Sequence, residues 1–384
     1  MYTRNQLLID AQTDSVFLFG ARQTGKSMLL RSLFPDATYI DLLETDVQHR
    51  FRMQPSLLRD ILNNHPDNSL VIIDEIQQVP ELLNEVHLLI SRKQIRFVLC
   101  GSSARKLKRQ GVNTLGGRAL PEQLYPLVSD EIPDFDLQRA LRQGLLPKIY
   151  LSERPSRLLQ AYVDVYLKEE IQAEALVRNL KSFTRFLEVA ALTNGEIVNY
   201  NNIATDCGVS AKTVAEYFSI LQDTLIGYLV PAFVSKQKRR LVQAPKFWFF
   251  DVGVANHLLH RKDLVPGTVE YGHAFEHFVV QELIAYLGYH YNELRLTYWR
   301  TYTGLEVDAV ITNHTGEPIL AIEIKSAQEI MRKHLKGLHA FHQEYPDCPL
   351  LCVSLDKFNR ESEGVQLLYV RDFLKQLWAD SLVK

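Results

Sequence analysis

GARQTGKS, residues 20–27, matches the pattern G-x-x-x-x-G-K-[ST] in full. The stretch follows the apolar run VFLF at 16–19 and precedes a helical pattern at 26–33. A phosphate-binding loop needs this context, because its backbone N–H groups converge on phosphate oxygens only between a buried parallel strand and a helix. The alternative, a chance glycine-rich turn, does not account for both flanking elements. The stretch therefore predicts an α/β fold built on a parallel sheet, with a site for ATP.

The residue types in this loop have separate expected roles. Lys26 supplies positive charge for the β- and γ-phosphates, and the Ser27 hydroxyl is a candidate ligand for Mg²⁺. Gly20 and Gly25 allow backbone geometry that a Cβ would hinder. The expected nucleotide-binding residues are Gly20, Ala21, Arg22, Gln23, Thr24, Gly25, Lys26, Ser27 and Met28.

A second apolar run, LVII at 70–73, ends in Asp74 and Glu75. An unbroken run of this kind predicts a central parallel strand buried on both faces. We expect Asp74 to hold Mg²⁺ through its water shell and Glu75 to orient or activate the attacking water, as a catalytic residue. A surface strand with an acidic end is the alternative, and the phosphate loop in the same chain disfavours it.

Two further positions are candidates for contact with the γ-phosphate. The strand at 96–100 ends at Gly101, and Ser102 or Ser103 would then lie between the tips of the two strands already named. A serine turn is the alternative there. Arg118 is the candidate for stabilising charge on the transferring phosphoryl group, in its own subunit or across to a neighbour. A structural ion pair is equally compatible with Arg118.

Composition limits the class of protein. A chain of 384 residues with 46% hydrophobic and 23% charged residues is ordinary for a soluble protein of two or three domains. No apolar run approaches the ~20 residues that cross a bilayer, and the N-terminus lacks the core of a signal peptide. Four cysteines without a metal or disulfide framework fit a cytoplasmic location without membrane contact. A net charge of −2 means that nucleic acid would have to bind a local patch.

The order of patterns along the chain predicts four units. Residues 1–125 are expected to form the P-loop parallel-sheet ATPase core, and 126–180 a helical lid or linker divided at Pro147. Residues 181–265 are expected to form a winged helix, and 266–384 an α/β domain like that of restriction endonucleases. The expected strands of the first unit are 16–19, 37–41, 70–74 and 96–100, and its expected helices are 26–33, 55–64 and 80–92.

The winged-helix prediction depends on the spacing of Ala204, Gly208 and Val214, with Ser210 as the cap of the second helix. Two strands, 229–234 and 246–250, follow it. The candidate DNA-binding residues are Lys212 and Thr213 on the second helix and Lys236, Lys238, Arg239 and Arg240 between the strands. Cations at a hairpin tip suit contact with phosphate, whereas a solvated charged loop is the alternative.

The last unit carries a second group of polar residues. Asp308 on one strand, with Glu323 and Lys325 on another, follows the pattern of a nuclease of the restriction-endonuclease type, and Glu276 on a helix would complete the group. Alternation along a strand places Glu323 and Lys325 on one face. These carboxylates are candidates for a second Mg²⁺ or Mn²⁺, with Lys325 near the scissile phosphate. A simple ion pair between Asp308 and Lys325 is the alternative.

The whole chain resembles the prokaryotic AAA-type ATPases that carry a C-terminal domain of unknown function. The resemblance spans nearly the full length and is carried by these segments: GARQTGKS, VIIDEIQQVP, CGSSARKL, GGRAL, YLKEEI, KFWFFDVGVANHL and EVDAV with AIEIKSA. It implies ATP binding by the loop, Mg²⁺ at Asp74, catalysis by Glu75 and phosphate sensing near Ser102 and Arg118. It also suggests the terminal group as a nuclease-like set, with no acidic position lost.

Two classes of function remain open from the sequence. One is an ATPase that acts on DNA, with metal-dependent cleavage by the last unit. The other is a nucleotide switch that recognises a protein partner, with the winged helix and the last unit as scaffolds. The net charge of −2 favours the second, whereas the basic segment 236–240 and the complete acidic set favour the first.

Overall fold

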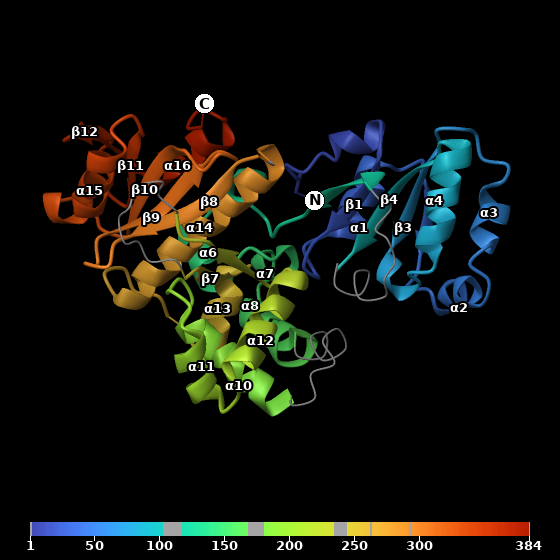
Figure 1. The fold of residues 1–384 in the computed structure, drawn as a ribbon, viewed down its shortest axis with the longest axis horizontal. Helices are drawn as coiled ribbons and strands as arrows, with labels where there is room; N and C mark the ends of the chain where they lie inside the picture. The colour runs from blue at the N-terminus through green and yellow to red at the C-terminus, as the bar shows by residue number, and fades with distance from the viewer. Residues whose placement is uncertain are drawn as a thin grey trace.

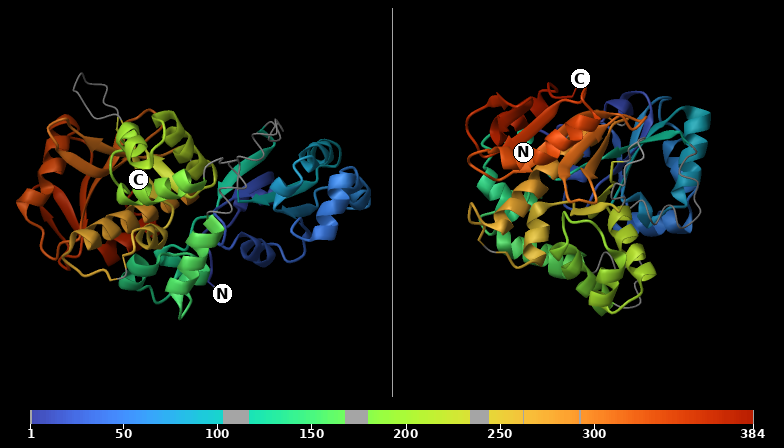
Figure 2. Two further views of the ribbon diagram at one scale, coloured as in Figure 1. Left: turned by 90° about the horizontal axis from the view of Figure 1, so that it is seen from below. Right: turned by 60° about the vertical axis from the view of Figure 1, so that its left-hand side comes forward.

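The protein consists of two sheet-containing parts separated by a helical part (Figure 1). The computed structural model describes residues 2–102, 117–167, 180–233, 244–261, 263–291 and 293–383. Seen from below, the N-terminal sheet and the C-terminal sheet lie at opposite ends of the molecule, with helices between them (Figure 2). No helix in these ranges combines the length and the apolar composition of a transmembrane span.

The N-terminal sheet is parallel throughout, with the order β2-β3-β4-β1-β5. Its strands are β1 (Ser15–Phe19), β2 (Thr38–Asp41), β3 (Leu70–Asp74), β4 (Arg96–Gly101) and β5 (Ala119–Gln123). The connecting segments contain η1 (Ile9–Gln12), α1 (Lys26–Leu33), α2 (Thr45–Met53), α3 (Leu57–Leu62), η2 (Ile76–Gln78) and α4 (Leu82–Lys93). The predicted parallel sheet is confirmed, and its four predicted strands are β1 to β4.

The sequence analysis missed α2 and β5. Strand β5 contains Pro121 and Glu122 and pairs only with β1, at the edge of the sheet. Proline is confined largely to edge strands, because it cannot donate a ladder hydrogen bond. The strand order has a consequence for function: β4 lies between β1 and β3, so the carboxyl ends of these three strands meet at one edge.

The central part is mainly helical and includes one hairpin. It contains η4 (Ser129–Glu131), α6 (Leu137–Gln143), α7 (Pro147–Tyr150), α8 (Pro155–Gln160), the π-helix η5 (Ala161–Leu167), α10 (Leu180–Leu192), α11 (Tyr200–Cys207), α12 (Ala211–Asp223), β6 (Gly227–Val230), β7 (Lys246–Phe249) and α13 (Val252–Leu258). The described residues of 126–180 do not form a separate lid. Leu141 of α6 shares a core with the long helix that follows α13, and Leu159 of α8 shares one with α10 to α12.

The predicted helix-turn-helix geometry is present in α11 and α12. Gly208 has φ 66°, which lets the chain turn sharply between the helices. Ser210 Oγ accepts a hydrogen bond from the backbone N–H of Thr213 at 3.1 Å, as expected for a helix cap. Val214 is buried against the neighbouring helices. Strands β6 and β7 pair antiparallel after α12, and the four cations between 236 and 240 lie outside the described residues.

The C-terminal sheet has the order β12-β13-β11-β10-β9-β8. The elements of this part are α14 (Val269–His290), β8 (Arg295–Arg300), β9 (Glu306–Thr312), β10 (Pro318–Lys325), η6 (Arg332–Leu335), α15 (Lys336–Glu344), β11 (Leu350–Ser354), β12 (Arg360–Ser362), β13 (Val365–Tyr369) and α16 (Val370–Trp378). Ile322 faces the core that contains α14, whereas Ala321 faces the core of α15. Alternation therefore places Glu323 and Lys325 on the α15 side of β10.

Candidate functional site

The phosphate loop connects β1 to α1 in the expected conformation. Gly25 precedes α1 with φ 97°, a region that favours glycine, and a Cβ on Gly20 would lie only 2.6 Å from the carbonyl oxygen of Leu124. Lys26 is buried, and its Nζ donates hydrogen bonds to the carbonyl oxygens of Gly20 at 2.8 Å and Ala21 at 3.1 Å. The ammonium group therefore lies inside the loop, where a phosphate chain would need it.

Glu75 lies at the end of β3 in a left-handed conformation, with φ 58°. A non-glycine residue adopts this conformation uncommonly, and its cost has to be offset by surrounding contacts. Its side chain is buried, and burial raises the pKa of the carboxyl group, although the charges of Lys26 and Arg22 oppose the rise. This electrostatic contact shows that the predicted catalytic carboxyl and the phosphate loop lie close together.

Gln77 connects the ends of β3 and β4. Its Nε2 donates hydrogen bonds to the Glu75 carboxylate and, at 3.2 Å, to the Ser102 hydroxyl. Ser102 follows β4, the strand between β1 and β3, so it lies at the same edge of the sheet as the phosphate loop and Glu75, and its contact with the γ-phosphate stays a prediction. Ser103 lies outside the described residues. The sequence analysis missed Gln77, because its position after Glu75 gave no sign that the chain turns back toward β4.

Tyr39, on β2, is a second missed residue at this edge of the sheet. Its hydroxyl donates a hydrogen bond to Asp74 Oδ2 at 2.5 Å, and the Ser27 side chain lies nearby. Burial, followed by the bond to Asp74, raises the pKa of the Tyr39 hydroxyl far above its ordinary value. The two expected Mg²⁺ ligands, Ser27 and Asp74, therefore both lie near one phenolic oxygen.

The donor set at this point fits Mg²⁺. Mg²⁺ prefers oxygen ligands and is usually bound by one or two carboxylates together with water and substrate phosphates. Ser27 supplies a hydroxyl at the end of the phosphate loop, and Asp74 supplies a carboxylate at the end of β3. The described residues contain no group of three or more His, Cys, Asp or Glu side chains arranged for a metal. A metal held here would therefore depend on nucleotide oxygens as well.

Arg118 does not lie at this site. It immediately precedes β5, and its neighbour Ala119 pairs with Ser15 at the start of β1. The phosphate loop leaves the other end of β1, beside Gln123. Arg118 is exposed at the amino edge of the sheet, so it lies away from the phosphate loop of its own subunit, and contact with a nucleotide across to a neighbour stays a prediction. Strand β5, which the sequence analysis missed, carries the chain across the sheet after Arg118.

Arg4 is a third missed residue and contacts the phosphate loop directly. Its Nη1 donates to the carbonyl oxygen of Thr24 at 2.7 Å, and its Nη2 donates to that of Tyr125 at the same distance. Its Nε pairs with Glu131 at 2.8 Å. These contacts hold the loop against the segment that leaves β5. The central helices approach the loop too, because Ala21 shares a core with Leu146 and Tyr162.

The four predicted nuclease-like residues lie together in the C-terminal part, where they line a cavity of about 420 Å³. Lys325 Nζ lies 3.1 Å from Asp308 Oδ2 and 2.5 Å from Glu323 Oε1. Lys246, from β7, pairs with Glu276 at 3.6 Å and also with Glu306. The sequence analysis missed Lys246 and Glu306. Lys246 reaches the cavity from β7, an element distant in the sequence from both of its partners, which no local pattern reveals.

The cavity of about 420 Å³ in the C-terminal part, called the terminal cavity below, holds several buried carboxyl groups whose negative charges repel one another. Burial, with a further contribution from Asp308, raises the pKa of Glu276 to about 7 and that of Glu323 well above its ordinary value. Glu323 Oε2 is buried without a hydrogen-bond partner, although the residue lines the cavity. The ion pair between Asp308 and Lys325, the alternative from the sequence, is present as well.

The predicted DNA-binding residues are only partly described. Lys212 is exposed on α12, whereas Thr213 is partly buried and its hydroxyl lies 2.9 Å from that of Ser210, in the cap of the helix. Glu216 is exposed on the same helix. Lys236, Lys238, Arg239 and Arg240 lie outside the described residues. The described surface of α12 therefore presents charges of both signs.

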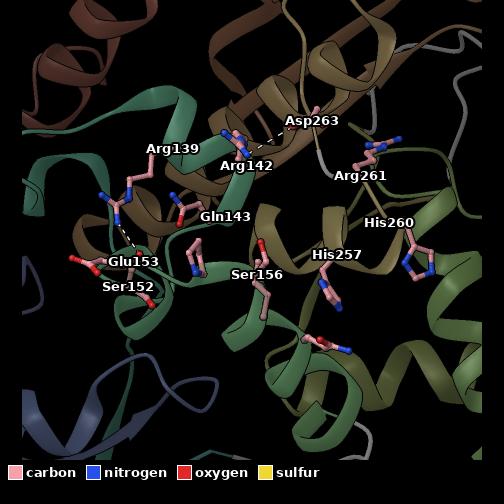
Figure 3. A pocket seen from close by; sticks show the side chains of 13 residues that line it. Arg139, Arg142, Gln143, Ser152, Glu153, Ser156, His257, His260, Arg261 and Asp263 are labelled. Atoms are coloured by element: carbon pink, nitrogen blue, oxygen red, sulfur yellow. Dashed lines mark hydrogen bonds and ion pairs between the residues drawn. The ribbon is translucent and has the colours of Figure 1, made fainter.

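A cavity of about 960 Å³, not expected from the sequence, lies among α6, α8 and α13 (Figure 3). Arg139, Arg142 and Arg261 contribute positive charge to its lining, and Glu153 and Asp263 contribute negative charge. Arg142 faces Asp263 across 3.9 Å. Because opposite charges lie together in it, the lining does not select a ligand of one charge.

Comparison with known proteins identifies the N-terminal part. Residues 12–132 match the family model described as an AAA domain, and 134–264 and 271–373 match two domains of unknown function (DUF8612 and DUF4143). Two mycobacterial proteins, Uncharacterized protein Mb2031c of Mycobacterium bovis and Uncharacterized protein Rv2008c of Mycobacterium tuberculosis, are each 26% identical over 321 residues. Each alignment covers 81% of this chain and 70% of the relative.

Two solved structures show a limited likeness. The Walker-type ATPase paby2304 of Pyrococcus abyssi is 14% identical, with a TM-score of 0.42, over 64% of this chain and 90% of that chain. The Aeropyrum pernix ORC1 protein in complex with DNA is 14% identical, with a TM-score of 0.26, over 65% of this chain and 87% of that chain. Both scores are too low to support an argument about this protein. Residues 12–132 match the AAA domain model and contain the phosphate loop and the parallel sheet, which supports a P-loop ATPase of the AAA type in this part of the chain.

Proposed function

We propose that this protein binds ATP with Mg²⁺ and hydrolyses it at the edge of the N-terminal sheet. One observation carries the proposal: Lys26 and Ser27 at the start of α1 meet Asp74 and Glu75 at the end of β3, with Ser102 between them at the end of β4. Lys26 would hold the β- and γ-phosphates, and Ser27 and Asp74 would hold Mg²⁺, which neutralises phosphate charge when bound.

Glu75 would orient the attacking water and accept its proton. The raised pKa of its carboxyl group makes it a better proton acceptor than an exposed glutamate. Gln77 fixes the carboxylate, and Ser102 lies where the γ-phosphate would be detected. Equilibrium binding of a fluorescent ATP analogue tests the first step: the wild type should bind it in the presence of Mg²⁺, and Lys26→Ala should bind it at least tenfold more weakly. Equal affinities would contradict the assignment.

Action on DNA is the broader function that we propose, with α11, α12 and the β6–β7 hairpin as a winged helix. The helix cap at Ser210, the turn at Gly208 and the hairpin after α12 support this assignment. The segment 236–240 contributes four cations for phosphate contact. The alternative is a nucleotide switch that binds a protein partner through the same surface, and the exposed Glu216 on α12 favours that alternative.

Metal-dependent cleavage of DNA is a second candidate activity, located in the terminal cavity. The observation that favours it is Glu323, whose buried Oε2 has no hydrogen-bond partner and whose neighbours are further carboxylates. Holding carboxylates this close is costly unless cations neutralise them, and Lys325 and Lys246 leave Glu323 Oε2 without a partner. A second Mg²⁺ or Mn²⁺ at Asp308 and Glu323 would supply that charge, and Lys325 would lie beside the scissile phosphate.

We also propose that the protein forms a homo-oligomer and is located in the cytoplasm. The exposed Arg118 would contact a nucleotide on a neighbouring copy in a homo-oligomer, since its own loop is at the other edge of the sheet. The four cysteines are free and buried, which suits a reducing cytoplasm.

A further inference from the structure

Tyr39 occupies a position at the nucleotide site that its sequence neighbours do not suggest. The residue pairs with Ile72 in the ladder between β2 and β3, and its ring packs on the α1 side of the sheet. From there the hydroxyl reaches the end of β3 and donates to Asp74 Oδ2 at 2.5 Å. The Ser27 side chain lies close to the same hydroxyl.

The ring of Tyr39 is held from a second side. The Arg31 guanidinium carbon lies 3.9 Å from the ring centroid, in a cation–π contact. Arg31 in turn lies 3.7 Å from Asp41, two residues beyond Tyr39 on β2. These contacts keep the hydroxyl directed at Asp74, so the hydrogen bond does not have to order a free side chain each time it forms.

We propose that the Tyr39 hydroxyl competes with Mg²⁺ for Asp74 Oδ2, and thereby sets the Mg²⁺ concentration at which the nucleotide complex forms. This inference rests on the proposed function of the site. A hydroxyl that donates to a carboxylate forms a short, charge-assisted hydrogen bond. The bond occupies one lone pair of Asp74 Oδ2 and draws charge from it, so it weakens direct or water-mediated binding of a cation to that oxygen. Asp74 Oδ1 keeps its own donor, the backbone N–H of Glu75 at 3.0 Å.

The competition predicts the direction in which the Mg²⁺ requirement changes when the hydroxyl is removed. Tyr39→Phe keeps the ring, its contact with Arg31 and its packing, and removes only the donor. Asp74 Oδ2 then loses the group that competes with the cation, so Mg²⁺ should bind at a lower concentration. Had the hydroxyl instead supported the metal, the same variant would need more Mg²⁺. Regulation follows from the arrangement, since any movement of Arg31 or Asp41 that shifts the ring changes the Mg²⁺ requirement.

The test is a Mg²⁺ titration at a fixed concentration of a fluorescent, non-hydrolysable ATP analogue, followed by its change in anisotropy. Half-saturation in Tyr39→Phe should occur at about tenfold lower Mg²⁺ than in the wild type, the effect of one hydrogen bond to a charged group. Tyr302→Phe is the matched control, because Tyr302 is exposed and lies in the C-terminal part. Its titration should coincide with that of the wild type.

Two results would overturn the inference. An unchanged half-saturation in Tyr39→Phe would show that the hydroxyl does not compete, and a higher one would show that it supports the metal. Thermal unfolding of both variants establishes that the fold is intact. If the wild type binds the analogue and Tyr39→Phe shows either result, only this inference fails. If the wild type does not bind the analogue at any Mg²⁺ concentration, the proposed function fails with it.

Discussion

The Arg4 guanidinium donates a hydrogen bond to the backbone carbonyl of Thr24, at 2.7 Å, inside the phosphate loop. The same side chain pairs with Glu131, and both side chains are almost completely buried. Arg4 therefore joins the beginning of the chain, the phosphate loop and the start of the central part. Such a residue affects both the stability of the fold and the shape of the nucleotide site.

Replacing Arg4 should destabilise the protein. Arg4→Ala leaves the Glu131 carboxylate buried without its partner, and we expect the free energy of unfolding to fall by roughly 3 kcal/mol. Urea denaturation followed by circular dichroism measures this. Arg50→Ala is the control, because Arg50 forms an exposed i,i+4 pair with Asp46 and should change stability by less than about 0.5 kcal/mol. Equal effects of the two variants would show that the buried pair is not structural.

The second prediction concerns pH. The pKa of His277 is lowered to about 4 by burial. Its Nε2 donates to the carbonyl oxygen of Phe249 at 2.7 Å, so its Nδ1 must accept from Asn194 Nδ2, at 3.2 Å. The ring is therefore neutral in the folded protein, whereas the unfolded chain binds a proton at a pKa near 6.5. Because the unfolded state binds more protons between these values, stability should fall as the pH is lowered from about 6.5 toward about 4.

The size of this effect can be measured by comparison with a variant. Between pH 7 and pH 5 the wild type should lose about 2 kcal/mol of stability through His277. His277→Gln cannot take up a proton at this position. Its loss of stability between pH 7 and pH 5 should therefore be smaller than that of the wild type by about 2 kcal/mol, whatever its stability at pH 7. A direct measurement of the His277 pKa by NMR gives the second check. A pKa near 6.5 would contradict the neutral, buried ring.

The third prediction tests DNA binding by the segment 236–240. Charge reversal of Lys236, Lys238, Arg239 and Arg240 should lower the affinity for duplex DNA and flatten its salt dependence. Each lost phosphate contact reduces the slope of log affinity against log salt by ~0.9. Reversal of the exposed Arg50 and Arg52 on α2 serves as a control and should leave the slope unchanged. Coinciding slopes for wild type and the 236–240 variant would favour the protein-partner alternative.

The fourth prediction concerns the terminal cavity. With Mn²⁺ present, the protein should nick supercoiled plasmid DNA, and the double variant Glu323→Ala, Lys325→Ala should not. The control replaces an exposed pair of the same types, Lys357→Ala with Glu361→Ala, and should retain the activity. Equal nicking by all three proteins would indicate contamination, and no nicking of any DNA form would leave the cavity without a nuclease role.

The sequence predicted those features of the nucleotide site that depend on neighbours along the chain. The phosphate loop, the buried strands and the acidic pair at the end of β3 follow from local patterns of apolar and polar residues. The position of Ser102 was predictable because parallel strands align their carboxyl ends at one edge. The terminal group around Glu323 was predictable from alternation along β10.

The missed residues depend on contacts between elements. Tyr39 looks like an ordinary strand residue until the pairing of β2 with β3 carries its hydroxyl to Asp74. Arg4 acts on a loop twenty residues away, and Lys246 acts on a cavity formed by a later part of the chain. The edge of the sheet that Arg118 occupies follows from strand β5. This strand contains Pro121 and was not predicted from the sequence.

The most direct test of the account is phosphate release by Glu75→Gln compared with the wild type. Gln77 and the phosphate loop stay in place in this variant, so binding of ATP with Mg²⁺ should be retained within about threefold, while the loss of the proton acceptor should reduce turnover by at least about a hundredfold. Affinity and phosphate release are measured on the same preparation. Retained binding with turnover abolished is the predicted result, and normal turnover in Glu75→Gln would contradict the assignment of this site.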